Sequence, residues 1–206
     1  MVKIFVEGGG QTADIQQKCR KGFHEFLAKA GVCKRPRIVA SGSRQEAYKD
    51  YCTAVRNGED AFLLVDSEGP VDPAHQNGNS TDWIPWAHLG KQEGWEKPAR
   101  VDEDACHLMV RCMENWFLAD RETLRTYFGQ GFLEGALPAA SRPLESIPKP
   151  DVLAALKKAT VHLKTKAPYD KGAHSFALLG RVDPVRILEN SPWARRFVDA
   201  LRNHPS

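Results

Sequence analysis

The first third of the chain alternates short apolar runs with longer helical patterns, and this alternation restricts the possible folds. Residues 61–65 are continuously apolar, which is typical of a strand covered on both faces in a parallel sheet. Residues 2–6 and 37–40 have the composition of two further strands. Between them, residues 13–30 and 43–55 carry apolar side chains at helical spacing. The pattern predicts consecutive βαβ units, and therefore a parallel sheet with helices on both faces.

The rest of the chain predicts one more strand and several helices. Residues 71–104 are rich in proline, tryptophan and polar residues, and we expect a long irregular loop there with one short helix near residues 82–89. Residues 107–112 predict a fourth strand. We therefore expect an α/β core of about four mainly parallel strands in residues 1–128. Residues 129–206 are expected to form a helical C-terminal extension packed on the same domain.

Composition fits a folded domain and excludes few functions. The 206 residues are 42% hydrophobic and 27% charged, as in ordinary globular proteins. No apolar run of about 18 residues is present, so we expect no membrane span. The chain enters a strand at once, without a basic stretch followed by an apolar one, and we expect a cytoplasmic protein. A net charge of +3 permits contact with nucleic acid but does not argue for it.

The five cysteines are scattered and include no Cys-x-x-Cys pair, which indicates reduced thiols and not a disulfide framework. Cys106, His107 and Cys112 lie close in sequence, and a zinc site at these residues is one interpretation. The simpler interpretation is that they belong to a core strand, because apolar residues separate them.

Acidic side chains follow two of the predicted strands. Glu7 comes directly after the first strand, and Asp66 and Glu68 follow the third. The carboxyl ends of parallel strands meet at one edge of a sheet, which is where open α/β sheets bind ligands. In an extended segment, residues two apart point the same way, so Asp66 and Glu68 are expected to face one site. Three such carboxylates need a cation, and oxygen ligands favour Mg²⁺ or Mn²⁺.

Three glycines, Gly8, Gly9 and Gly10, follow the first acid. Because they lack a Cβ atom, we expect them to bind or admit a phosphate group of the substrate. They match neither a P-loop, which needs Gly-Lys-Ser/Thr, nor the Gly-x-Gly-x-x-Gly fingerprint. A nucleotide-sensing module is therefore a weaker alternative.

With these residues in place, the chain resembles the Toprim fold, a Rossmann-like fold whose signature is a glutamate after the first strand and Asp-x-Asp after the third. Phe5-Val6-Glu7-Gly8 and Val65-Asp66-Ser67-Glu68 carry the resemblance, with glutamate in place of the last aspartate. Glu114-Asn115-Trp116-Phe117-Leu118-Ala119-Asp120 and Tyr169-Asp170-Lys171 extend it over most of the chain. The chain is similar to Toprim-like proteins of unknown function related to RloB and to the OLD (overcoming lysogenization defect) nucleases.

The resemblance implies a metal-dependent nuclease that acts on nucleic acid, with DNA favoured. Glu7 would act as a metal ligand or general acid/base, with Asp66 and Glu68 as further ligands. OLD-type sites use two metal ions and often place a second acid one turn after the first glutamate. This chain has Gln11 there and Asp14 one turn later, so either one or two ions are expected.

Three further residues complete the expected site. Glu114 is the remaining candidate ligand for a second ion, and a helix-capping role is its alternative. Lys171, in a predicted loop, would offset charge on the scissile phosphate, as a lysine does in OLD-type sites. His174 is a candidate phosphate contact, with a structural, hydrogen-bonded histidine as its alternative.

The resemblance also implies partners. Relatives often occur beside an ATPase of the ABC or SMC-like type, so we expect a two-part system for defence against phage or plasmids. A homodimer is the default for the class. The alternative is a non-catalytic binding or regulatory subunit with a degenerate site, which Gln11 and the Asp-x-Glu variant favour.

Overall fold

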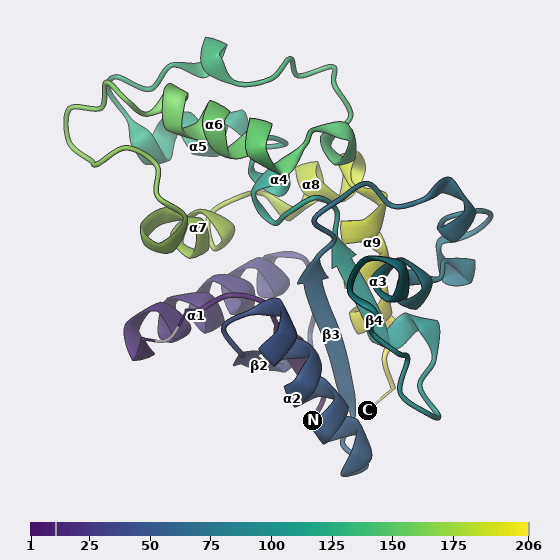
Figure 1. Cartoon of the computed structure of the whole chain (residues 1–206). Helices are drawn as coiled ribbons and strands as arrows, with labels where there is room; N and C mark the ends of the chain where they lie inside the picture. Colours follow the sequence, from purple (N-terminus) through teal and green to yellow (C-terminus); the bar gives the residue numbers. More distant parts are fainter. Residues whose placement is uncertain (11, 206) are drawn as a thin grey trace.

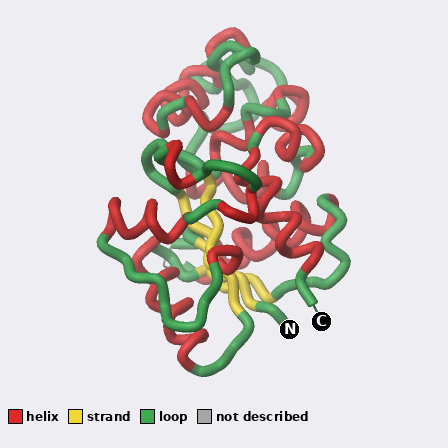
Figure 2. Tube along the Cα trace, turned by 90° about the vertical axis from the view of Figure 1, so that its right-hand side faces the viewer, coloured by secondary structure: helices red, strands yellow, loops and turns green. Residues whose placement is uncertain are grey.

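The computed structural model describes residues 1–10 and 12–205. Its centre is a sheet of four parallel strands in the order β2-β1-β3-β4. The strands are β1 (Lys3–Val6), β2 (Arg37–Ala40), β3 (Ala61–Asp66) and β4 (Cys106–Met109). Figure 2 shows them in the middle of the molecule with helices around them. The α/β class and the parallel sheet expected from the sequence are confirmed.

Nine α-helices occur in the part of the chain that the structure describes (Figure 1). They are α1 (Ala13–Lys29), α2 (Arg44–Arg56), α3 (Pro85–Glu93), α4 (Glu114–Phe117), α5 (Arg121–Phe128), α6 (Lys149–Ala159), α7 (Lys171–Leu179), α8 (Pro184–Asn190) and α9 (Pro192–Asn203). None of the helices in residues 1–10 and 12–205 has the length and apolar content needed to cross a membrane.

The two faces of the sheet bury different hydrophobic clusters. Ile4 and Leu64 point to the face covered by α1, whereas Phe5 and Leu63 point to the face covered by α2 and α3. All six residues of β3 are buried, as its continuous apolar sequence predicts. The sequence order explains the two layers, because the chain runs from β1 outward to β2 and then crosses back over β1 to reach β3.

The second half of the chain packs against the same core. Helices α4 to α7 lie beyond the carboxyl edge of the sheet, and α9 returns along β4, so that the two chain termini lie near each other (Figure 1). Leu156 of α6 and Phe197 of α9 belong to the same hydrophobic cluster as Ile4 of β1. The helices of residues 129–206 therefore share the core of the preceding residues.

Several predicted boundaries are corrected. The fourth strand ends at Met109 and not at residue 112, because Arg111 adopts a left-handed backbone (φ 66°) that bends the chain away. The Arg111 amide donates to the hydroxyl of Ser67, 2.8 Å away, which fixes this bend against the end of β3. The helix expected near residues 82–89 begins later, at Pro85, and extends to Glu93. Lys171 was expected in a loop, but it is the first residue of α7.

Helices α1 and α7 pack closely because glycine stands at their contact. A Cβ atom on Gly22 of α1 would lie 2.5 Å from the carbonyl oxygen of Phe176 in α7. This oxygen belongs to the backbone, which cannot swing aside as a flexible side chain can. The contact fixes α7, and with it Lys171, relative to the first strand and helix.

We expect Gly22→Ala to lower the free energy of unfolding by about 1–3 kcal/mol, the usual cost of forcing extra volume into a packed interior. The clash outweighs the gain in helix propensity, which is at most about 1 kcal/mol. Urea denaturation followed by circular dichroism measures the change. Gly135→Ala is the matched control, because nothing lies within 4 Å of its Cβ position. Equal stability of the two variants would contradict the close packing.

Candidate functional site

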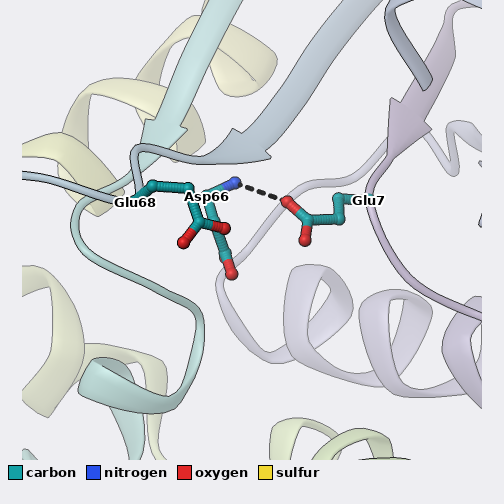
Figure 3. Close-up of side chains that lie close together, drawn as sticks. All are labelled: Glu7, Asp66 and Glu68. Carbon is teal, nitrogen blue, oxygen red and sulfur yellow. Dashed lines mark hydrogen bonds between the residues drawn. The ribbon is translucent and has the colours of Figure 1, made fainter. Parts of the chain in front are cut away.

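The first two acids meet where the order of the strands reverses. β1 and β3 are neighbours, and the Glu7 amide donates to the carbonyl of Leu64 at 3.2 Å. The side chain of Glu7 then turns toward β3, where its Oε2 accepts from the Asp66 amide at 3.2 Å (Figure 3). This crevice at the carboxyl ends of the strands is the usual ligand site of an open α/β sheet.

Glu68 joins the two other acids by a route that differs from the prediction. β3 ends at Asp66, and Glu68 lies in the left-handed region with φ of 59°. The Glu68 amide donates to the carbonyl of Arg111 at 3.1 Å, which holds this turn in place. One carboxylate oxygen from each of Glu7, Asp66 and Glu68 lies within 4.8 Å of the others. The convergence is confirmed, but a turn produces it and not strand alternation.

A lysine that the sequence analysis missed neutralises two of these acids. The Nζ of Lys149 lies 3.1 Å from Asp66 Oδ2 and 2.5 Å from Glu68 Oε1. Lys149 is the first residue of α6 and lies between two prolines. No local pattern marks it, because it is 83 residues distant from Asp66 in the sequence.

Glu114 and Lys171 lie beside the same site. Lys171 Nζ is 3.5 Å from Asp66 Oδ2 and 3.8 Å from Glu114 Oε2, so it bridges the two acids. Glu114 is fully buried, and its Oε1 accepts hydrogen bonds from Tyr169 and Ser175 at 3.1 and 3.0 Å. Its Oε2 has no hydrogen-bond partner. Glu114 is therefore a buried acid with one free oxygen directed to the Lys171 side of the site.

Arg44 is the third basic residue near these acids. Arg44 follows the Ser43 cap of α2, and its Nε lies 3.6 Å from Glu7 Oε2. Its NH1 lies 2.6 Å from Glu93 of α3. The sequence predicts only a helix at Arg44, yet the Arg44 side chain links Glu7 after β1 to Glu93 of α3.

The balance of charge explains an unusual acid. Four carboxylates face three basic groups, the side chains of Lys149, Lys171 and Arg44. Burial, reinforced by the negative charge of Asp66, raises the pKa of Glu7 from 4.5 to about 8. Burial likewise raises the pKa of Asp66. Because Arg44 also pairs with Glu93, negative charge remains in excess at this site even when Glu7 holds a proton.

Two of the glycines after Glu7 pack against other elements, and the phosphate role of this turn stays a prediction. Gly8 exchanges two backbone hydrogen bonds with Gly42, of 2.8 and 3.0 Å. A Cβ on Gly8 would lie 2.8 Å from the ring of Phe176, and one on Gly9 would lie 2.9 Å from Ala40. All three glycines also have positive φ, but only Gly10 is exposed. The turn packs against β2 and α7 at the end of β1.

His174 and Asp14 do not belong to the carboxylate group. The His174 ring is buried, packs against Tyr169 and Phe128, and accepts from the Asp170 amide at 3.0 Å through Nδ1. These contacts match the structural alternative for this histidine. Gln11, where a second acid was expected, lies outside the described residues. Asp14 is paired with Lys18 at 2.7 Å on exposed helix surface.

The zinc interpretation has no geometric support. Within residues 1–10 and 12–205, the one group of three or more potential ligand side chains close enough to hold a metal ion is Glu7, Asp66 and Glu68. His107 instead stacks on Phe62, and Cys112 donates to the side chain of Asn115. The alternative that they belong to the core is confirmed by their complete burial.

The donor set of the carboxylate group suits a hard divalent cation. It offers oxygen atoms from three acids, and Mg²⁺ and Mn²⁺ prefer such ligands. Glu114 is not part of this group, because Lys171 lies between its Oε2 and Asp66, 3.8 Å from the first and 3.5 Å from the second. A cation here would replace the proton of Glu7 and the ammonium group of Lys149 as the balancing charges.

Residues 6–202 match the family model described as a domain of unknown function (DUF4276), and the chain belongs to this family. The match contains the whole carboxylate group and the lysines around it. No curated protein and no solved structure matches the chain.

The raised pKa of Glu7 predicts a pH dependence of stability in metal-free buffer. The unfolded side chain loses its proton near pH 4.5, whereas the folded one keeps it until about pH 8. Over this range the folded state binds more protons, so the free energy of unfolding falls as the pH rises. Glu7→Gln removes this contribution, and we expect its stability relative to wild type to increase between those pH values.

Urea denaturation with a chelator present measures this difference across the pH range. Glu189→Gln is the control, because Glu189 is an exposed acid on α8. A wild-type curve parallel to that of Glu7→Gln would show that Glu7 does not hold a proton in the folded state.

Proposed function

We propose that this chain is a Mg²⁺- or Mn²⁺-dependent phosphodiesterase that hydrolyses nucleic acid, with DNA as the favoured substrate. The observation that carries the proposal is the convergence of Glu7, Asp66 and Glu68 within 4.8 Å at the carboxyl edge of β1 and β3. The Toprim-like order of these acids in the sequence supports the same assignment.

The surrounding residues fit phosphate chemistry. When bound, a divalent cation would polarise a phosphoryl oxygen and lower the pKa of a bound water. Lys171 is 46% exposed at its side chain, so its ammonium group is accessible while it also contacts Asp66 and Glu114. It is placed to offset negative charge on a phosphodiester that approaches the acids.

Glu7 is placed to hold a cation. Burial and Asp66 raise its pKa to about 8 without a metal ion, and a bound cation would take the place of that proton. Its Oε2 is oriented by the Asp66 amide and by Arg44. We assign Glu7 as metal ligand or general acid/base, as in the sequence-based prediction.

A second function is favoured by one observation. Lys149 already neutralises Asp66 and Glu68 within the chain, so the acids have a partner even without a metal ion. This arrangement is compatible with a non-catalytic subunit that binds nucleic acid for an ATPase of the ABC or SMC-like type. The family resemblance supports such a partner for either function, as it does a role in defence against phage or plasmids.

Cleavage assays test the proposal. We expect purified protein, alone or with an ATPase partner of the type that the resemblance implies, to cut nucleic acid only when Mg²⁺ or Mn²⁺ is added. Asp66→Ala should lower the rate by at least about a hundredfold, because a buried electrostatic group at a reaction centre typically contributes that much. Asp50→Ala, at an exposed acid of α2, is the control and should cut at the wild-type rate.

Equal rates for wild type and Asp66→Ala would refute the site. Binding of nucleic acid without cleavage under every metal condition, with the ATPase present, would favour the non-catalytic subunit instead.

A further inference from the structure

Two adjoining hollows on the outer surface of α7 carry unpaired positive charge. One, of about 450 Å³, lies between α1 and α7 and is lined by Lys18, Lys21, Glu25 and Arg181, among others. The other, of about 340 Å³, is lined by residues of α5 together with Lys166 and Arg181. Arg181 lines both hollows, and we call the two together the α7 groove.

The charges of the α7 groove do not cancel. Its lining contains four basic side chains and two acids, Glu25 and Glu122. Two of the basic side chains have partners, since Lys21 lies 3.8 Å from Glu25 and Lys18 lies 2.7 Å from Asp14. Glu122 pairs with Arg125 outside the lining. Within residues 1–10 and 12–205, neither Lys166 nor Arg181 forms an ion pair with an acid. Two exposed cations are therefore available for an anionic ligand.

An aromatic ring holds these two cations in place. Lys166 Nζ lies 5.1 Å and Arg181 Cζ 5.0 Å from the centre of the Tyr127 ring, the range of a cation–π contact. Tyr127 is half-buried against Phe128 and His174. The positive charge of Arg181 and Lys18 lowers the pKa of its hydroxyl, although burial raises it overall. The two cations therefore lie on one ring and close to each other.

Helix α7 connects the α7 groove with the carboxylate site. Lys171, which contacts Asp66, begins α7, and Arg181 follows the end of the same helix. Nine helical residues span about 13 Å. Helix α7 contacts both α1 and α5, and Figure 1 shows α1 and α7 side by side. A flexible chain with repeated negative charges can reach both the groove and the acids.

A third hollow is lined by more acidic than basic side chains. It has about 550 Å³ and lies between β3 and α9, lined by Asp102, Glu103, Asp104 and Asp199 among others. These acids would repel phosphate groups. Of the two regions, only the α7 groove has the charge to bind a polyanion.

We propose that the α7 groove binds the backbone of single-stranded nucleic acid and guides it to the carboxylate site. The inference rests on the proposed function in one respect, that nucleic acid is what the acids act on. Single strands suit the α7 groove because a flexible backbone can bend to contact Lys166, Arg181 and the acids together. Basic grooves of this kind track a strand through its phosphates without reading its sequence.

Binding is measured without cleavage, with a chelator present and fluorescently labelled short single strands of DNA and RNA. We expect the double variant Lys166→Ala/Arg181→Ala to bind roughly tenfold more weakly than wild type at moderate salt. Loss of two phosphate contacts should also reduce the slope of log K against log salt by about 1.4. Circular dichroism confirms that the variant is folded.

The matched control removes the same charges elsewhere. Lys49→Ala/Arg56→Ala lies on exposed α2 positions, on the opposite face of the sheet, and should bind as wild type does. An equal loss in both double variants would overturn the groove and indicate a general charge effect. Tighter binding of duplex than of single strands would overturn the assignment of a single strand. Equal displacement by an acidic polypeptide would reduce the groove to a non-specific anion surface.

The two proposals fail separately. If the double variant binds strands as tightly as wild type while wild type cuts with Mg²⁺, the groove is wrong and the nuclease stands. If wild type binds strands through Lys166 and Arg181 but cuts nothing with any metal, the groove stands and the nuclease is wrong.

Discussion

The buried carboxylate of Asp66 joins more parts of this structure than any other group in the site. It is 1% exposed, and its Oδ1 accepts from the Met113 amide at 2.9 Å, after β4. Its Oδ2 contacts Lys149 of α6 and Lys171 of α7. Its amide donates to Glu7 after β1. One acid at the end of β3 thus orients the helices that cover the carboxyl edge.

Such a group has a cost that the fold offsets with cations. An isolated buried carboxylate is unfavourable, and hydrogen bonds and opposite charges are what stabilise it. Here the compensation comes from both lysines and from a proton on Glu7, whose pKa is about 8. The proposed function requires that a divalent cation replace this proton and the contacts of Lys149 with the acids.

The sequence predicted the parts of this arrangement that depend on local patterns. The order of strands and helices, the buried β3 and the meeting of Glu7 with Asp66 follow from periodicity and from the rule that parallel strands end at one edge. Lys149 and Arg44 could not be found this way, because their roles arise from contacts between segments distant in the sequence. Three-dimensional packing decides such contacts, and no spacing rule encodes them.

The glycines after Glu7 are a second example of contacts that local sequence does not predict. Gly8 and Gly9 follow an acid and suggest a phosphate loop, yet Phe176 and Ala40 occupy the space beside them. Phe176 comes from a helix far along the chain, so the local motif cannot reveal it. Glu68 likewise reaches the site through a left-handed turn that the strand pattern did not predict.

Anomalous scattering from crystals soaked in Mn²⁺ tests the central claim most directly. We expect a manganese ion bonded to oxygen atoms of Asp66 and of Glu7 or Glu68, with the Lys149 ammonium group displaced from them. A site without manganese, in which Lys149 keeps its contacts of 3.1 Å to Asp66 and 2.5 Å to Glu68, would contradict the account.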